Sequence, residues 1–520
     1  MFRKIFLSLS RKERSVFKIA LAFFAVSAIL IITSFVQRST VVVAASGGEY
    51  RFGLVGQPAI VNPVLPASET DQTLAEMTFA NLGQLSDAIT QVDTNVWDVH
   101  LKQNIFWQDG APITSEDIIF TINTIENPEA NSPLFASFQG VRAEKKSQLE
   151  VQFTLPTSYV FFADDHLKNL GLIPEHIFSG VAPQNLTLSK YSLNPIGSGP
   201  YEFSDYQSDD AGFITQMTLK ESNTYYVGHA PYIPKLVIKF YKTTADAVKA
   251  FDQGQIDGLG MSTSYYLPQI TLRHNTYFLP SNRYYAIFIN QSTDPSLASA
   301  SLRQALSQAI DREALVKTVL GGRAVPFYGP TSLTGAPSFS GTLGTSTLTG
   351  ENLILTVPKE PFLTQTAEII KNDWEKYGAS VTIKSTDEAG FVNNILRGNN
   401  YSLLLFGNVT KANQDLYSFW DSSQYPYPGQ NLSFYHNSRV DALLEDYRTN
   451  SSPTARAAEL KQLSDQIAND YPATFLYSPD YVYVSSPSLG GFSPKESVDM
   501  PSDIYSQVTD WYVNTRRVFK

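Results

Sequence analysis

Hydrophobic and polar residues follow two different spacings along most of the chain. Short extended patterns predict β-strands at residues 51–55, 214–219 and 236–241. Apolar residues three or four positions apart predict helices over residues 302–310 and 455–469. Because strands and helices alternate along the chain, the sequence indicates α/β architecture rather than a helical bundle or a β-sandwich.

Residues 329–350 interrupt this pattern. Five Gly, two Pro, four Ser and six Thr account for 17 of these 22 residues, which is typical of a loop or linker. A strand–helix–strand–helix–strand run over residues 352–406 follows. That order predicts a compact α/β lobe with a parallel sheet.

The first 48 residues are expected to lie outside the globular fold. Residues 19–36 form an uncharged apolar run of 18 residues, about the minimum that crosses a bilayer core as a helix. Six Lys and Arg residues and one Glu precede it, so the positive-inside rule keeps residues 1–18 in the cytoplasm and exports the rest. We predict an uncleaved, single-pass signal anchor in the cell membrane, with a signal peptide cut near Ala45 as the alternative.

Composition and charge exclude several kinds of site and argue against one class of partner. A chain of 520 residues is long enough for roughly three domains. It has no Cys, which excludes disulfides, Cys-ligated zinc and a thiolate nucleophile. The net charge is −10, and because the leader at 1–18 contributes +5, residues 19–520 carry −15. An acidic body without a basic tract argues against a nucleic-acid partner.

No catalytic motif stands out in the sequence. The six His residues do not occur at HxH or HxxxH spacing, and GxSxG, GxxxxGK(S/T) and GxGxxG sequences are absent. Carboxylate pairs are plentiful among the 49 Asp and Glu residues, and nothing marks one of them as a glycosidase dyad. We therefore predict a protein that is not an enzyme and has neither a metal site nor a cofactor.

Six segments carry a resemblance to a known family. Residues 99–117 read VHLKQNIFWQDGAPITSED, and the others read GQPAIVNP (56–63), NPIGSGPY (194–201), NTYYVGHAPY (223–232), FDQGQIDG (251–258) and LRQALSQAIDREAL (302–315). In this order they resemble the motifs of the family 5 extracellular solute-binding proteins, the peptide-binding receptors of ABC importers. The resemblance covers nearly all of residues 49–485.

The resemblance implies a two-lobe α/β fold of the periplasmic-binding-protein type (type II), with an extra subdomain in lobe one and the transmembrane helix in front. Two crossing strands, expected near residues 279–281 and 476–477, would join the lobes around the ligand. The implied division is a cytoplasmic leader at 1–18, the transmembrane helix at 19–36, a linker at 37–48, the lobe-one core at 49–66, 196–277 and 477–520, its subdomain at 67–195, and lobe two at 278–476.

The resemblance also implies where the ligand lies. In family members an extended peptide is added as a strand between two backbone edges. These edges correspond here to Ala67, Ser68 and Glu69 on one side and to Asn408, Val409 and Thr410 on the other. One of Tyr284 and Tyr285 is expected to face the ligand, because neighbours in a strand point to opposite sides. Trp420 is a candidate for an aromatic wall, with a core position as the alternative.

The second edge departs from the peptide-binding pattern. Well-known oligopeptide binders have an Asp shortly after this strand, which pairs with the α-ammonium group of the peptide. Here Lys411 occupies the stretch, and the first carboxylate is that of Asp415. Lys411 would repel an α-ammonium group if it faced the cleft, and would have no such effect if it faced solvent. Peptides are the expected ligands, with sugars, opine-like compounds and metal chelates as alternatives.

The implied function is that of an extracellular substrate-binding receptor of an ABC importer. The protein would capture peptides or similar small solutes and deliver them to permease subunits by hinge closure, as a monomer attached to the membrane. An anchored cell-surface hydrolase that acts on peptide or glycan through a carboxylate pair is the alternative. A receptor that signals without transport is a further alternative.

Overall fold

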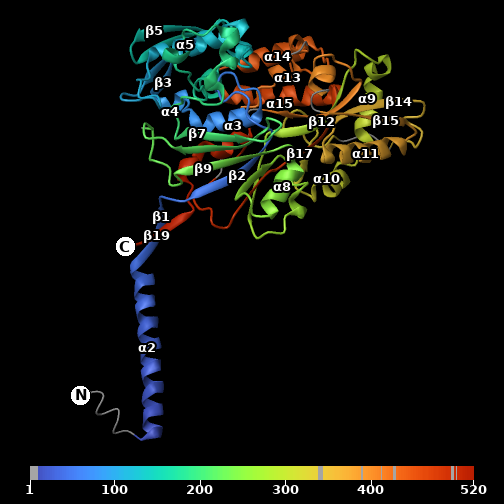
Figure 1. Ribbon diagram of the computed structural model, residues 1–520. Coiled ribbons are helices and arrows are strands. Elements are labelled where there is room, and N and C mark those ends of the chain that lie inside the picture. The colour runs from blue at the N-terminus through green and yellow to red at the C-terminus, as the bar shows by residue number, and fades with distance from the viewer. Residues whose placement is uncertain are drawn as a thin grey trace.

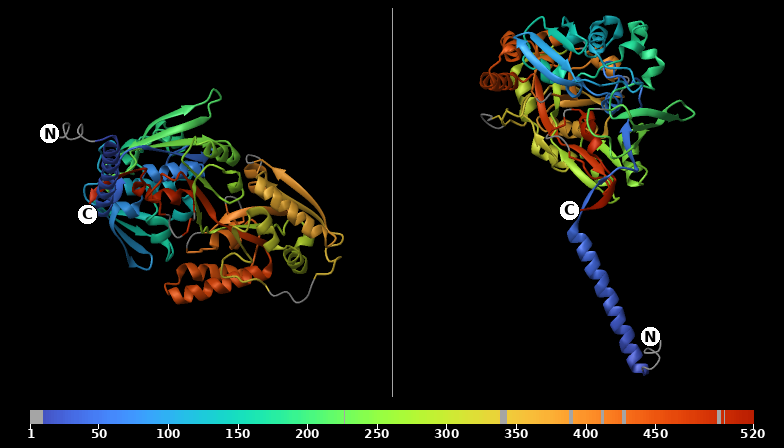
Figure 2. Two further views of the ribbon diagram at one scale, coloured as in Figure 1. Left: turned by 90° about the horizontal axis from the view of Figure 1, so that it is seen from below. Right: turned by 90° about the vertical axis from the view of Figure 1, so that its left-hand side faces the viewer.

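A long helix carries a body of two lobes in the computed structural model (Figure 1). The structure describes residues 10–225, 227–337, 343–387, 391–410, 413–425, 429–493, 497–498 and 500–520. Seen from below in Figure 2, the blue and green elements of one lobe lie beside the gold and orange elements of the other.

Lobe one is built on a mixed sheet with the strand order β11-β18-β10-β2-β9-β8-β7. The strands are β2 (Glu49–Val55), β7 (Tyr201–Ser208), β8 (Ile214–Glu221), β9 (Lys235–Tyr241), β10 (Gly258–Met261), β11 (Asn275–Leu279) and β18 (Tyr481–Ser485). The central strand β2 runs parallel to β9 and β10, and α8 (Thr244–Asp252) connects these two neighbours. Tyr50 and Phe52 of β2 are fully buried, as expected for a strand covered on both faces.

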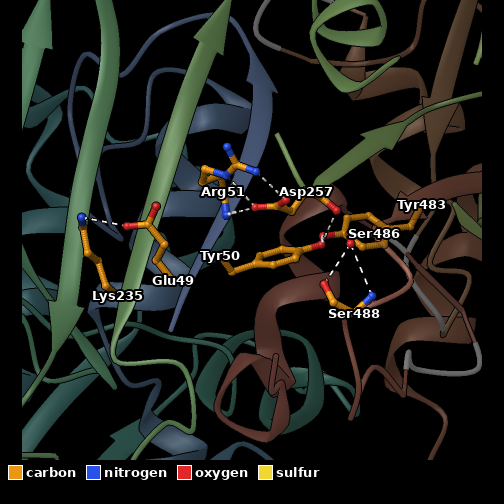
Figure 3. Close-up of polar contacts among 8 residues, drawn as sticks. All are labelled: Glu49, Tyr50, Arg51, Lys235, Asp257, Tyr483, Ser486 and Ser488. Atoms are coloured by element: carbon orange, nitrogen blue, oxygen red, sulfur yellow. Dashed lines mark hydrogen bonds and ion pairs between the residues drawn. The ribbon is translucent and has the colours of Figure 1, made fainter. Parts of the chain in front are cut away.

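Polar contacts connect β2, β10 and β18 near the centre of this sheet (Figure 3). Arg51 forms a bidentate ion pair with Asp257, in which Nε to Oδ2 and Nη2 to Oδ1 both measure 2.8 Å. The hydroxyl oxygens of Tyr50 and Tyr483 lie 3.1 Å apart, and the Ser486 N–H donates to the Asp257 carbonyl at 2.7 Å. Because Asp257 precedes β10 and Tyr483 belongs to β18, these contacts fix the strand by which the chain returns to lobe one.

An antiparallel sheet with the order β3-β4-β6-β5 forms the extra subdomain. Its strands are β3 (Ser86–Asp93), β4 (Val96–Leu101), β5 (Arg142–Ser147) and β6 (Glu150–Thr154), and the nearby helices are α3 (Glu69–Thr78), α4 (Leu82–Leu85), α5 (Ser115–Glu126), α6 (Phe135–Phe138) and α7 (Glu175–Phe178). Thr114 and Asp117 form a capping box at the start of α5, as the sequence predicts. Ile118, Ile122 and Ile125 of α5 are fully buried, which fits their helical spacing.

Lobe two contains a sheet with the order β13-β17-β12-β16-β14-β15. Its strands are β12 (Arg283–Ile289), β13 (Ala324–Pro326), β14 (Asn352–Pro358), β15 (Ser380–Thr386), β16 (Leu403–Val409) and β17 (Ala473–Pro479), and its helices are α9 (Ala300–Gln308), α10 (Arg312–Leu320), α11 (Pro361–Glu375), α13 (Tyr417–Trp420), α14 (Ser438–Thr449) and α15 (Pro453–Asp470). β14 runs parallel to β15 and β16, which confirms the prediction for this run. Residues of α9, α10 and α11 cover one face, and residues of α13, α14 and α15 cover the other.

The chain passes between the two sheets twice. β11 belongs to the first sheet and β12 to the second, and Asp480 alone separates β17 from β18. Tyr477 to Pro479 lie in lobe two, because β17 still pairs with β12 and β13 there. The return to lobe one therefore comes after Pro479, later than the expected residue 477. Leu279 likewise belongs to lobe one, because β11 pairs with β18 up to that residue. The other domain bounds stay predictions.

The apolar run near the N-terminus lies in α2 (Arg11–Ser39), which projects from the body (Figure 1). Its segment Lys12–Ser39 is the one helix in the described part of the chain that is long and apolar enough to cross a membrane, and no part of its apolar window is buried.

Residues 37–48 are not a plain linker, contrary to the expectation. β1 (Thr40–Ala45) pairs with β19 (Asn514–Phe519) in an antiparallel ribbon, from Thr40↔Phe519 to Ala45↔Asn514. Three consecutive Val residues favour the extended conformation of β1. The partner strand lies about 477 residues away along the chain, so no local pattern predicts the pairing.

Gly258 begins β10 and lies against the hydroxyl groups of Tyr50 and Tyr483. A Cβ atom there would lie 2.2 Å from the Tyr50 hydroxyl oxygen and 2.4 Å from that of Tyr483, so Gly258→Ala has to displace both rings. We expect this variant to lower the free energy of unfolding by about 1–3 kcal/mol, as overpacking of a tight core does. Chemical denaturation of the full-length protein would measure the loss. Gly180→Ala is the control, because no heavy atom lies within 4 Å of its added Cβ. Equal midpoints for the two variants would contradict the prediction.

Candidate functional site

β16 ends in an edge that is open on one side. Its pairing with β12 extends to Arg283↔Val409, whereas its pairing with β14 ends at Thr356↔Leu404. Within the residues that the structure describes, no strand pairs with residues 405–409 on the side away from β12. This side of β16 therefore has no strand partner among the described residues.

The direction of the backbone groups along this edge follows from one hydrogen bond. The Thr410 N–H donates to the Asn282 carbonyl at 3.1 Å, and so does the Thr410 hydroxyl. Because backbone groups alternate along an antiparallel pair, those of Asn408 also point toward β12, while those of Gly407 and Val409 point away. Of the three residues predicted for this edge, Val409 is therefore the one whose N–H and C=O face the open side.

Ala67, Ser68 and Glu69 begin a helix rather than form a strand. Ser68 is the N-cap of α3, and its Oγ accepts from the Asp71 N–H at 3.1 Å. The buried carboxylate of Asp71 accepts the N–H of Ala59 at 2.8 Å and that of Ala67 at 3.1 Å. The Ala67 N–H is therefore not free to bind a ligand. The group of this turn that reaches lobe two is the Glu69 side chain.

An ion pair connects this turn to lobe two. Arg283 Nη2 lies 3.2 Å from Glu69 Oε1, and 18% of the Arg283 side chain is exposed. The backbone of Arg283 is in register with Val409. The two predicted edges, one from each lobe, therefore approach each other on either side of Arg283.

The aromatic candidates lie in the core of lobe two. Tyr284 and Tyr285 point to opposite faces of the sheet, but both faces are covered, and the two residues are 1% and 4% exposed. Tyr284 stacks on Phe327 with ring centroids 5.4 Å apart. Trp420 is fully buried and packs against Phe288, which is the core position considered as the alternative. A ligand contact by any of these rings stays a prediction.

A second set of contacts joins the subdomain to lobe two. This interlobe cluster consists of Tyr159 and Asp165 from the subdomain and Asn413, Asp415 and Arg448 from lobe two. The Tyr159 hydroxyl lies 2.8 Å from Asp165 Oδ2 and 3.0 Å from Asp415 Oδ2. Burial, together with the charges of Asp415 and Asp165, raises the pKa of Tyr159, so its phenol stays protonated and donates.

Arg448 holds the centre of the interlobe cluster. Its Nε lies 3.1 Å from Asp415 Oδ2, and its Cζ lies 4.5 Å from the ring centroid of Tyr159 and 4.4 Å from that of Tyr417. Both distances suit cation–π contacts. Asp415 is thus engaged within the protein. Lys411, whose direction the sequence left open, lies outside the described residues.

Other candidate binding features lie away from this interface. Among the described residues, no group of three or more Asp, Glu or His side chains could hold a metal ion. A cavity of about 220 Å³ is lined by residues of lobe two alone, so it does not lie between the lobes. Arg312 in its wall is bonded to the carbonyls of Phe475 at 2.7 Å and Ser307 at 3.0 Å, which satisfies a buried cation.

Comparison with known proteins identifies the family. Residues 85–429 match the model of the bacterial extracellular solute-binding proteins, family 5 middle, which is more than half of the chain. The chain belongs to the family 5 extracellular solute-binding proteins. This family 5 protein is 23% identical to the oligopeptide-binding protein AppA of Bacillus subtilis (strain 168) in an alignment of 513 residues that covers 90% of this chain and 92% of AppA.

Solved structures share the fold of this family 5 protein. AppA from Bacillus subtilis in complex with a nonapeptide has a TM-score of 0.75 at 21% identity, covering 90% of this chain and 99% of AppA. NikZ from Campylobacter jejuni in complex with Ni(L-His) has a TM-score of 0.74 at 21% identity, covering 89% and 99%. These likenesses confirm the predicted two-lobe α/β fold. The family confirms the predicted function as a substrate-binding receptor of an ABC importer, and no comparison supports the hydrolase alternative.

Three residues that connect the lobes of this family 5 protein were not identified from the sequence. Arg283 is a charged residue at the start of an otherwise apolar strand, and this position is the one local feature that could have indicated its role. Tyr159 and Arg448 come from different lobes and meet through lobe packing. No sequence pattern marks such a pair.

Arg448→Ala should loosen the contact between subdomain and lobe two. The change removes a cation held between two tyrosine rings and paired with Asp415, and we expect a loss of about 1–2 kcal/mol of interlobe stabilisation. The chain has no Cys, so spin labels at Glu129→Cys and Glu445→Cys report the interlobe distance without interference. We expect a longer and broader distance distribution by pulsed EPR.

Arg439→Ala is the matched control for this experiment. Arg439 also lies on α14, is exposed, and belongs to neither the interlobe cluster nor its aromatic neighbours. Its substitution should leave the distribution unchanged. If Arg448→Ala behaves like Arg439→Ala, the interlobe cluster does not hold the lobes together.

Proposed function

We propose that this receptor captures peptides by adding them as a strand to the open side of β16. The observation that carries the proposal is the orientation of Val409, whose backbone N–H and C=O face away from β12 where β14 no longer pairs. Extended peptides bind such edges through main-chain hydrogen bonds, and side-chain pockets then select among sequences. Because Asp415 is engaged by Tyr159 and Arg448, backbone pairing rather than a carboxylate clamp fixes the ligand.

Ligand binding and lobe closure are coupled in this proposal. The edge at Val409 lies next to Arg283, which reaches across to Glu69 of lobe one. A peptide at this edge contacts both lobes, and a ligand shifts an equilibrium between open and closed forms only when it interacts differently with the two. The receptor releases its ligand unchanged to a permease and acts as a monomer without enzymatic activity.

We further propose that the N-terminal helix stays attached as a membrane anchor. A cut near Ala45 would remove β1 and leave β19 without its partner, although the two strands are in register over the whole length of β1. A segment that is removed during export has no need of a paired position in the folded body. The β1·β19 ribbon therefore supports retention of residues 1–45.

Val409→Pro tests the peptide edge. Proline removes the N–H that faces the open side and leaves the hydrogen bonds to β12 in place, so the fold should survive. We expect the full-length variant to retain at least about tenfold less peptide from a mixed library of nonapeptides, because a tenfold change corresponds to about 1.4 kcal/mol, near the value of one backbone hydrogen bond. Mass spectrometry of the retained peptides measures the loss and shows whether they remain uncleaved.

Val409→Ala is the control, because it keeps the amide and should bind normally. Normal retention by a folded Val409→Pro variant would rule out strand addition at β16. If the wild-type protein retains no peptide at all, the ligand belongs to another chemical class, although the protein is still a binding receptor. Cleaved peptides would contradict the absence of enzymatic activity.

The anchor has a separate test. Residues 19–36 are long enough to span the bilayer core, so the full-length protein should remain with membranes after a carbonate wash, as an integral protein does. Sequencing of its N-terminus should find the leader intact. Recovery of a soluble form beginning near Ala45 or Ser46 would show that the leader is cleaved and that β19 is left unpaired.

A further inference from the structure

Four basic side chains surround the point where the N-terminal helix enters the body. Arg38 lies in the last turn of α2, Arg516 and Arg517 lie in β19, and Lys520 follows that strand. All four are exposed, and none of them forms an ion pair with another described residue. We call these four residues the basic collar.

Strand pairing, not chance proximity, holds the basic collar at the end of the helix. The Lys520 N–H donates to the Ser39 carbonyl at 3.0 Å, and Arg517 Nη1 donates to Thr40 Oγ1 at 3.2 Å. Arg516 is in register with Val43. Figure 1 shows β1 and β19 together between the helix and the lobes. The ribbon therefore brings a segment from the far end of the sequence to the membrane side of the body.

The depth of the basic collar follows from the length of the apolar run, which ends at Val36. At a rise of about 1.5 Å per helical residue, Arg38 lies roughly 3 Å beyond the hydrocarbon boundary. At about 3.3 Å per strand residue, the ribbon carries Arg517 roughly 10–15 Å beyond it. The headgroup layer is about 5–8 Å deep on each side of the bilayer, and long cationic side chains reach toward it.

The charge of the basic collar contrasts with the charge of the body. Residues 19–520 carry −15, and the collar contributes +4 to this value, which leaves −19 for the rest of the exported chain. An acidic body is repelled by an anionic surface, whereas the collar is attracted to it within a Debye length of about 8 Å. Phe519, with 76% of its surface exposed, adds an apolar group beside the collar.

We propose that the basic collar binds the phosphate groups of anionic phospholipids in the outer leaflet and so sets the orientation of the body above the membrane. This inference rests on the proposed anchor, which brings the collar to the bilayer surface. A cationic side chain near such a surface is typically attracted to anionic lipids, and the attraction weakens as salt is added.

Lipid-specific quenching at Phe519 tests the proposal. A dye on Phe519→Cys is unique because the chain has no Cys, and Phe519 is exposed in β19 and in register with Thr40, close to the hydrocarbon boundary. The full-length protein is placed in nanodiscs that contain acyl-spin-labelled phosphatidylglycerol or phosphatidylcholine at equal mole fraction. We expect phosphatidylglycerol to quench about two- to fivefold more strongly at low salt, in keeping with attraction of several cations to anionic lipid. The ratio should fall to about one in 0.5 M salt, because the Debye length is then a few Å.

Matched variants distinguish an effect of the basic collar from an effect of the total charge of the protein. Arg516→Gln, Arg517→Gln and Lys520→Gln together should bring the ratio to about one, since they remove the outer cations. Lys249→Gln, Lys317→Gln and Lys384→Gln change the charge equally on exposed positions of the body and should leave the ratio unchanged. A ratio near one with the collar intact would overturn the proposal, and so would loss of the preference in the body control. A protein that does not co-purify with nanodiscs refutes the anchor, which is a different outcome from an anchored protein without lipid preference.

Discussion

Two side-by-side crossings connect the lobes, and the geometry of the cleft depends on the hydrogen bonds between them. The Ser478 hydroxyl, near the end of β17 and two residues before the second crossing at Asp480, donates to the Arg283 carbonyl at 2.7 Å and also lies 3.2 Å from the carbonyl of Ser281 in the first crossing. Arg283 is the residue that reaches Glu69 of lobe one and stands in register with Val409. A rotation of the lobes about the crossings therefore changes the distance between the two edges directly, without any rearrangement inside either lobe.

Local features of the chain were predictable because their causes are local. Asp311 caps α10 and Gly321 ends it in a left-handed conformation with φ of 59°, as expected from a short acceptor side chain and a residue without Cβ. The parallel run after residue 350 follows from alternating element types, which leave few right-handed connections to choose from. The family resemblance placed these elements in two lobes.

The parts that the sequence did not predict depend on long-range packing. Residues 67–69 lie in an irregular stretch that reads equally well as an edge, and the buried carboxylate of Asp71 is what turns them into a helix start. Trp420 and Tyr284 are aromatic residues of the kind that often line ligand-binding sites, but helices that follow later in the chain cover them. Which backbone groups of β16 face the cleft depends on its register with β12, and a shift of one residue would reverse that choice.

The ribbon of β1 and β19 also has a consequence for the order of events during biosynthesis. Its strands are separated by about 477 residues, and contacts between such distant segments form late because the intervening chain must first be ordered. In the anchored receptor that we propose, the lobes can fold during export, but until the ribbon forms only β1 attaches them to the helix. Pairing of β19 with β1 then fixes that attachment, so the body of such a receptor acquires a defined direction relative to the bilayer once β19 has been exported. Under the same proposal, a receptor without β19 would swing on its helix, whereas one with the paired ribbon would present its cleft to the permease from a fixed side.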